Sequence, residues 1–256
     1  ESMIANIDAD LVVYRCAATV PEHEGLEVAT YRIDCLMRQI IDATECTGFN
    51  AFLTGKGNFR KKINPEYKAN RKDTVPPFYL QECRAYLMGE WNGEMSNGCE
   101  ADDLLGIYQT ENTICCSLDK DLLMIPGKHF NWVKMEYKDV LQQDGLRMFY
   151  KQMLIGDRAD NIIGVNKIGP VKAEKLIEHL DDEQEMFETV YNLYDDPKRF
   201  VMNANCLWIS QQQGETWASR QDLALPSDCL QEVTVMLDFM KSLSQDISTE
   251  PTTIET

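Results

Sequence analysis

Short apolar runs alternate with amphipathic helical patterns through the first half of the sequence. The apolar runs predict strands at Met3–Ile7, Phe49–Leu53, Thr113–Cys116 and Phe130–Lys134. The spacing of apolar residues predicts helices over residues 29–45, from Pro76-Pro77 onward, and over Glu100–Tyr108. Strands that alternate with helices form parallel sheets covered on both faces. The sequence therefore predicts an α/β fold in which helices flank a mostly parallel sheet.

The pattern changes to helices alone after about residue 139. Apolar spacing predicts helices over residues 140–155, 171–180 and 186–194. We therefore expect an α/β core over residues 3–150, which includes a basic region at about 56–90, and an all-helical module over residues 151–243. The polar and acidic composition of residues 244–256 predicts a disordered tail.

Composition narrows the class of protein. No apolar run approaches the length of a membrane span, so we expect no membrane partner. The chain has nine cysteines, an odd number, and no C-x-x-C pair. This usage predicts reduced thiols, no zinc site and a cytoplasmic location. We expect a monomer by default.

Carboxylates gather where the expected strands and loops end. Asp8 follows the first strand, and Asp119 and Asp121 follow the third. The other candidates open a helix or lie in a short loop, so that the full set is Asp8, Glu100, Asp102, Asp103, Asp119, Asp121, Asp157 and Asp160. Because sites in open α/β sheets form outside the carboxyl ends of the strands, we expect these side chains to converge. Asp10 is a weaker candidate, since a loop after Asp8 would carry it outward.

A convergence of carboxylates needs cations. Without them the groups would repel one another and raise each other's pKa. Carboxylate oxygens suit Mg²⁺ or Mn²⁺, and two such ions can hold both the attacking and the leaving oxygen of a phosphodiester. Any one of these acidic clusters is explained as well by a helix N-cap or a solvated face. The four clusters together favour a site for two divalent ions.

The net charge of −17 argues against a nucleic-acid partner at first sight, but the basic residues are unevenly placed. Seven Lys and Arg residues lie between positions 56 and 72, against one Glu. Within this region, Lys68 and Arg71 share a helical face on which both could meet one phosphate. Tyr67 could stack on an unpaired base, and Lys72 extends the basic surface. Lys61 and Lys62 are better explained as a solvated basic face.

The segment from Ile163 to Lys172 has the pattern of a helix–hairpin–helix. Gly164 and Gly169 would let the backbone approach a phosphate, and the following helix N-terminus would supply N–H donors. Lys167 and Lys172 add positive charge. Carbonyl groups in the turn could hold a monovalent cation. A plain connection between two helices is the alternative, and the gathered lysines favour binding of duplex DNA.

These residues together resemble the flap endonuclease/5′→3′ exonuclease family, with Asn64–Lys72 similar to its bacteriophage branch. The resemblance covers about Met3 to Leu180. The motifs that carry it are Asp8, Tyr67-Lys68-x-x-Arg71, Glu100-x-Asp102-Asp103, Asp119-x-Asp121, Gly156-Asp157-x-x-Asp160-Asn161 and Gly164-Val165-x-x-Ile168-Gly169-Pro170.

The resemblance implies a PIN-like core, a helical arch over the active site, and a helix–three-turn–helix module. It implies one divalent ion held mainly by residues like Asp8, Glu100, Asp102 and Asp119, and a second nearer Asp121, Asp157 and Asp160. It also implies that Lys68 and Arg71 contact the scissile phosphate, and that the hairpin binds duplex DNA with K⁺. Among these residues, we expect Asp119 and Asp157 to be indispensable for cleavage.

The function expected on these grounds is structure-specific cleavage of DNA at 5′ ends, 5′ flaps, nicks, branches and RNA/DNA primer junctions during replication. Thr54 stands where the family has an aspartate, which puts the number of tightly bound ions in question. This departure leaves open a DNA-junction binding protein with weakened catalysis. A PIN-type ribonuclease is the other alternative, although it would not need the hairpin.

Overall fold

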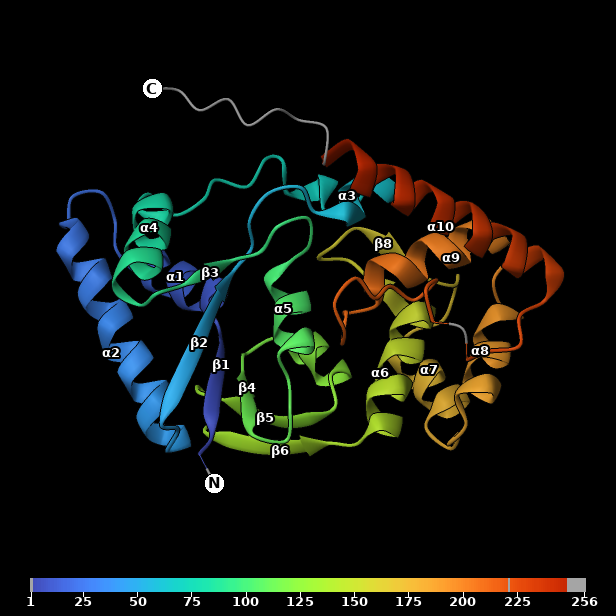
Figure 1. Cartoon of the computed structure of the whole chain (residues 1–256), viewed down its shortest axis with the longest axis horizontal. Helices are drawn as coiled ribbons and strands as arrows, with labels where there is room; N and C mark the ends of the chain where they lie inside the picture. Colours follow the sequence, from blue (N-terminus) through green and yellow to red (C-terminus); the bar gives the residue numbers. More distant parts are fainter. Residues whose placement is uncertain (1, 221, 248–256) are drawn as a thin grey trace.

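A six-stranded sheet forms the core of the N-terminal part (Figure 1). A computed structural model describes residues 2–220 and 222–247. The strand order is β3-β2-β1-β4-β5-β6, with bounds β1 Ile4–Asp8, β2 Gly48–Leu53, β3 Glu94–Met95, β4 Thr113–Cys116, β5 Gly127–Asn131 and β6 Glu136–Val140. All neighbouring strands are parallel except β5 and β6. The mostly parallel sheet is confirmed.

Successive strand residues send their side chains into two different cores. On one face, Ala5 and Ile7 pack with helices α1 (Ala9–Ala18), α2 (Leu26–Thr44) and α4 (Leu80–Glu90). On the other face, Phe52 and Cys115 pack with α5 (Ala101–Ile107) and with the helical module. The period of two residues along a strand places both cores against one sheet.

Four elements of the N-terminal part differ clearly from the sequence-based expectation. Helix α1 begins directly after Asp8, because the Asp8 carboxylate accepts a hydrogen bond from the Leu11 N–H at 3.4 Å and caps the helix. The strand expected at residues 130–134 lies at Gly127–Asn131, and it turns through Met135, with φ of 54°, into the unexpected antiparallel strand β6. Helix α4 begins at Leu80, three residues after Pro77.

The helical module starts earlier than expected. Helix α6 spans Gln142–Ile155, so the boundary predicted near residue 150 falls inside it. The module continues with β7 Gly156–Asp157, β8 Ile162–Ile163, α7 Pro170–Ile177, α8 Glu183–Tyr191, α9 Pro197–Leu207 and α10 Ser227–Ile247. The tail predicted from residue 244 begins instead as the last turn of α10, and residues 248–256 lie outside the described residues. No helix among the described residues has both the length and the apolar character of a membrane span.

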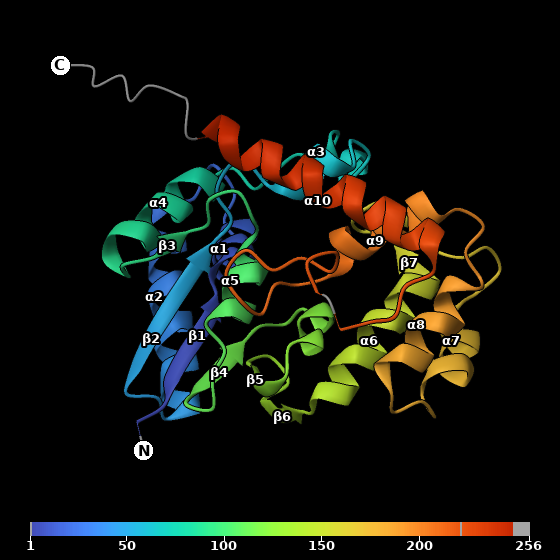
Figure 2. The same ribbon diagram turned by 45° about the vertical axis from the view of Figure 1, so that its right-hand side comes forward.

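The basic region carries less helix than the expected arch. It forms α3 (Phe59–Ile63), the 3-10 turn η1 (Ala69–Arg71) and α4, while residues 74–77 have no regular structure. Figures 1 and 2 show α3 lying beside α10, well away from α4. The Arg60 side chain fixes α3 to the module, because it donates hydrogen bonds at 2.8 Å to the carbonyl oxygens of Cys206 and Trp208.

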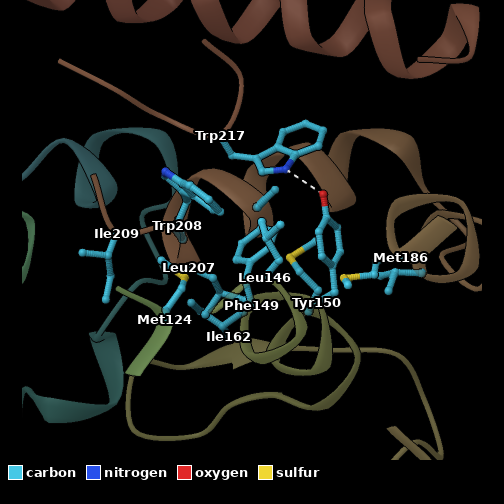
Figure 3. Close-up of a cluster of buried hydrophobic side chains, with 14 of the residues drawn as sticks. Met124, Leu146, Phe149, Tyr150, Ile162, Met186, Leu207, Trp208, Ile209 and Trp217 are labelled. Carbon is cyan, nitrogen blue, oxygen red and sulfur yellow. Dashed lines mark hydrogen bonds between the residues drawn. The ribbon is translucent and has the colours of Figure 1, made fainter. Parts of the chain in front are cut away.

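The segment from Cys206 to Trp217 contributes two buried tryptophans to the core. Trp208 meets Phe149 edge to face at 5.0 Å between ring centroids. Trp217 is also buried, and its indole N–H donates to the Tyr150 hydroxyl at 3.4 Å (Figure 3). Aromatic pairs of this kind stabilise by about 0.5–1.5 kcal/mol beyond the area they bury. They join the segment firmly to α6.

Candidate active site

Neighbouring parallel strands bring the first carboxylates together. Ile7 of β1 pairs with Cys116 of β4, so Asp8 and the loop that follows β4 meet at one edge of the sheet. The Ser117 hydroxyl in this loop donates to Asp8 at 2.7 Å and accepts from the Asp119 N–H at 3.0 Å. The direction of the strands therefore places Asp8 and Asp119 on opposite sides of one serine.

The electrostatics show that Asp102 joins the same group. Burial, followed by the negative charges of Asp8, Glu100 and Asp119, raises the pKa of Asp102 well above its ordinary value. Burial also raises the pKa of Asp8 to about 7, with further contributions from Asp10 and Asp119. Carboxylates whose pKa values rise in this way lack a compensating cation. Asp8, Asp102 and Asp119 form one such set.

A second set lies between the loop after β4 and the start of the hairpin. Asp121, in the 3-10 turn η2 (Lys120–Met124), has its pKa raised to about 7 by burial and by Asp119 and Asp157. Burial and Asp157 also raise the pKa of Asp160, against the lowering effect of Lys68. The Asp157 carboxylate accepts from the N–H groups of Ala159 and Asp160 and so shapes the loop that carries them.

The donor set fits divalent cations. Neither the Asp102 nor the Asp121 carboxylate forms a hydrogen bond or an ion pair with another described residue. Within residues 2–220 and 222–247, no group of three or more His, Cys, Asp or Glu side chains lies close enough together to hold a metal ion without rearrangement. The site is thus a loose set of hard oxygen ligands whose mutual repulsion a divalent ion would remove.

Asp103 does not belong to this set, contrary to the expectation from sequence. It is completely buried, and its carboxylate forms a bidentate pair with Arg60 at 2.6 and 2.8 Å. The Ser210 N–H donates to it at 3.0 Å. Although burial opposes ionisation, the Arg60 guanidinium holds the pKa of Asp103 below its usual value. Asp103 is a structural carboxylate, because all its charge is already compensated.

The expectation that Tyr67 stacks on a base is wrong. Only 3% of Tyr67 is exposed, since the ring lies in the core below the acidic residues. Its hydroxyl donates to Glu100 at 3.0 Å and to Asp160 at 3.2 Å. The tyrosine therefore links the start of α5 to the loop between β7 and β8.

Lys68 and Arg71 meet at the edge of the acidic set, although they do not lie on a regular helix. Lys68 has φ of 56° and precedes the turn η1. Its ammonium group pairs with Glu100, and it lies 3.8 Å from Asp160, which also pairs with Arg71 at 2.8 Å. The Arg71 side chain is 52% exposed. Lys72 is also exposed.

Thr54 is surrounded by residues that the sequence did not identify as a group. Its N–H donates to the Asp10 carboxylate at 3.0 Å, and Arg84 pairs with the same carboxylate at 2.8 Å. The Thr54 hydroxyl accepts from the Ala101 N–H at 3.0 Å, at the start of α5. Asp10 therefore lies beside Thr54, and both oxygens of its carboxylate already have partners. Nothing in the sequence marked Arg84 as its partner.

The hairpin glycines have different roles. Gly164 is buried, and a Cβ there would lie 2.4 Å from the Leu154 carbonyl oxygen and 2.5 Å from the Gly156 nitrogen. Gly164 is thus required by packing, and its expected phosphate contact is not supported. Gly169 is exposed, with nothing within 4 Å of an added Cβ. Lys167 and Lys172 are both exposed near it, at the N-terminus of α7.

No protein-family model matches the sequence. The chain is 28% identical over 171 residues to a 5′-3′ exonuclease of Buchnera aphidicola, a match that covers 60% of each chain. It is 31% identical over 169 residues to a DNA polymerase I of Rhizobium leguminosarum, covering 57% of this chain and 16% of that one. It is 24% identical over 205 residues to flap endonuclease Xni of Shewanella baltica, covering 73% and 78%. The chain thus matches less than two thirds of the length of the first two relatives.

Solved structures of similar fold include bacteriophage T5 flap endonuclease in a complex with DNA and metal ions. It has a TM-score of 0.60 and 17% identity, over 95% of this chain and 97% of that one. The catalytic core of Rad2 in complex with DNA has a TM-score of 0.50 and 15% identity, over 98% and 88%. At 15–17% sequence identity, the likeness to these two structures shows a shared fold only. The evidence for relatedness comes from the sequence matches. The chain is thus similar in sequence to a 5′-3′ exonuclease and a flap endonuclease, and it shares the fold of solved 5′ nucleases.

Proposed function

We propose that this chain is a divalent-metal-dependent nuclease that hydrolyses DNA phosphodiesters near 5′ ends and 5′ flaps. One observation carries the proposal. Carboxylates without a compensating charge come together from β1, α5 and the loop after β4. The positively charged side chains of Lys68 and Arg71, which can bind phosphate, lie beside them. The names of the sequence relatives, an exonuclease and a flap endonuclease, support the same reaction.

Mg²⁺ or Mn²⁺ fits the site better than a softer ion, because only carboxylates are offered. Asp8, Asp102 and Asp119 would hold one ion with Glu100 nearby, and Asp121, Asp157 and Asp160 would hold a second. When bound, such ions lower the pKa of water and stabilise charge on phosphate oxygens. Hydrolysis forms a bond from the water oxygen to phosphorus and breaks the bond to the 3′ oxygen, which takes up a proton. The products carry a 5′ phosphate and a 3′ hydroxyl.

Lys68 and Arg71 would bind the scissile phosphate. In the structure they are neutralised by Glu100 and Asp160. When these two carboxylates serve a divalent ion, the ammonium and guanidinium groups become free for phosphate oxygens. Before substrate binds, the same carboxylates thus hold the side chains of Lys68 and Arg71 in place. Lys72 would extend the contact along the strand.

The hairpin would bind the duplex part of the substrate without reading its sequence. Gly169 leaves space for a phosphate at the N-terminus of α7, where backbone N–H groups and the helix dipole favour an anion. Lys167 and Lys172 add two exposed charges. Flapped, nicked and branched duplexes, and RNA/DNA primer junctions, combine such a duplex with a 5′ end. We place the reaction in the removal of primers or flaps during replication.

The test uses labelled 5′-flap DNA, nicked duplex and single-stranded RNA, with Mg²⁺, Mn²⁺ or a chelator. We expect cleavage of the flap and the nicked duplex only with the divalent ion. Asp119→Ala and Asp157→Ala should each lower the rate of flap cleavage by more than about 100-fold. This is a larger loss than is usual for a residue that only contacts a metal ligand. Asp42→Ala, which removes an exposed carboxylate of α2, is the control and should cleave normally.

Two other functions predict different results in the same assay. A junction-binding protein with weakened catalysis, suggested by Thr54, would bind the flap without cutting it. A ribonuclease would cut the RNA in preference to the duplexes. Either result, or normal cleavage by both aspartate variants, would refute the proposal.

A further inference from the structure

The carbonyl groups at the start of the hairpin turn already have partners from α9. The Arg199 guanidinium donates through Nη1 to the carbonyl oxygens of Ile163 and Gly164, each at 2.9 Å. Asn203 donates to the Ile163 oxygen at 2.8 Å. The next carbonyl, that of Val165, accepts from the Ile168 N–H at 3.3 Å. Three consecutive carbonyl oxygens are therefore engaged by the protein itself.

Arg199 is held in this position by its surroundings. Its Nη2 pairs with Asp195 at 3.1 Å, and its guanidinium lies 4.7 Å from the centroid of the Tyr194 ring. Tyr194 is fixed in turn, because its hydroxyl donates to the Met153 oxygen at 2.6 Å and accepts from Asn203 at 3.1 Å. A permanent positive charge thus lies against the turn, and α6 and α9 position it together.

These contacts conflict with the K⁺ ion expected at this turn. A monovalent cation would need several carbonyl oxygens pointing at one empty space. Here the two lone pairs of the Ile163 oxygen are taken by Arg199 and Asn203, and the Gly164 oxygen faces the guanidinium. An ion at the same oxygens would lie within a few ångströms of a like charge in a partly buried place, which is strongly unfavourable.

We propose that Arg199 takes the place of the monovalent cation, so that the hairpin binds duplex DNA without K⁺. The inference rests on the DNA binding proposed above. It assigns a positioning role to a residue of α9, where the sequence suggested none. A guanidinium fixed by two carbonyl oxygens does the work of an exchangeable ion, since it neutralises the carbonyl dipoles of the turn next to the phosphate site at α7.

The experiment measures binding of fluorescent 5′-flap DNA at a single ionic strength in KCl, NaCl or tetramethylammonium chloride, with Ca²⁺ in place of Mg²⁺. The wild-type dissociation constant should agree within about twofold in the three salts, because cation release from DNA depends on ionic strength and no specific ion is needed. Arg199→Met should bind more weakly in tetramethylammonium and recover in part with K⁺. Lys198→Met removes the neighbouring exposed charge, has no bond to the turn and should show no such recovery.

Thermal unfolding without DNA supplies a second readout. A bound ion stabilises the folded state by mass action, so a K⁺ site would give a higher Tm in KCl than in tetramethylammonium chloride. We expect the same wild-type Tm in both salts. A K⁺-specific rise in the wild-type Tm, or weaker wild-type binding without K⁺, would overturn the inference.

The two proposals fail in distinguishable ways. Absence of DNA binding in every salt would contradict the proposed function, and the wild-type Tm comparison would still decide about the ion. If Arg199→Met does not fold, Arg199→Lys keeps the charge but loses the forked donor geometry. The lysine variant should fold and bind DNA with an affinity between those of the wild type and a variant without charge.

Discussion

Asp102 and Asp103 are adjacent in sequence and opposite in chemistry. The Asp103 carboxylate has a bidentate arginine partner, whereas the Asp102 carboxylate has no partner among the described residues. Removing one member of a buried ion pair leaves an uncompensated charge, but removing a carboxyl group that other carboxylates repel relieves that repulsion. The two residues should therefore respond to the same substitution in opposite ways.

We predict that Asp103→Asn destabilises the metal-free protein by about 3 kcal/mol, because the buried Arg60 loses its bidentate partner and keeps only the Glu100 carboxylate, at 3.2 Å. Asp102→Asn should leave the free energy of unfolding unchanged or raise it, and should abolish cleavage. Urea unfolding with a chelator, followed by the flap assay, measures both effects. Equal stability of the two variants would contradict the distinction between a structural and a metal-binding carboxylate.

The buried hydroxyl of Tyr67 should stabilise the fold and should not contact DNA. Tyr67→Phe removes hydrogen bonds to Glu100 and Asp160 and should cost about 1–3 kcal/mol of stability, as for bonds to charged groups. The affinity for flap DNA, measured with Ca²⁺, should not change, because the ring is buried. Tyr14→Phe, on an exposed tyrosine of α1, is the control. If Tyr67→Phe lost much of its DNA affinity without losing stability, Tyr67 would contact DNA after all, and the structural role assigned to its hydroxyl would be wrong.

At the scale of elements, the hairpin and α7 combine a tightly packed base with an exposed tip. Gly164 packs against Gly156 and Leu154, which fixes β8 to the end of α6. Gly169 and the lysines lie on the outer side of the turn. Packing thus determines where the turn is, and the exposed residues determine what it can bind.

We predict that Lys167→Gln and Lys172→Gln each weaken binding of flapped DNA. Each should also lower the slope of log affinity against log salt by about 1, because one fewer counterion is released. Titrations over a range of salt concentrations measure the slope. Lys134→Gln, in the β5–β6 turn, removes an exposed lysine away from the hairpin and should leave the slope as it is. An unchanged slope for both hairpin variants would mean that DNA does not contact this turn.

Across the whole molecule, the acidic set couples folding to pH. The pKa values of Asp8 and Asp121 rise from 3.8 to about 7 in the folded protein. A raised carboxyl pKa means that the folded state binds the proton more tightly than the unfolded state does. The stability that these groups contribute is thus fully present below pH 3.8 and is lost as the pH rises through about 7.

We therefore predict that Mg²⁺ raises Tm more at about pH 8 than at about pH 5.5, because the ion binds carboxylates only when they have lost their protons. Calorimetry of the chelated and the Mg²⁺-loaded protein at the two pH values measures the difference. The double variant Asp8→Asn/Asp121→Asn should lose most of this pH dependence. An equal Mg²⁺ effect at both pH values in the wild type would contradict the prediction.

The local pattern of the sequence determined the parallel sheet and the places where carboxylates would meet. Strand periodicity is a short-range property, and parallel strands that lie side by side must end at the same edge. Helix α1 and strand β6 were not predicted, because hydrophobic periodicity does not define them. An aspartate cap begins α1, and a tight turn after β5 leads into β6.

The tertiary structure decided which charged and polar groups are compensated. Asp103, Tyr67 and Arg199 each bond to a residue far away along the chain. These partners are Arg60, Asp160 and Gly164, at separations of 43, 93 and 35 residues. A hydrogen bond or an ion pair depends on distances of a few ångströms, and sequence spacing does not constrain these between distant segments. For this reason the sequence could name eight acidic candidates, and only the folded chain could separate the carboxylates without a compensating partner from Asp103, which pairs with Arg60.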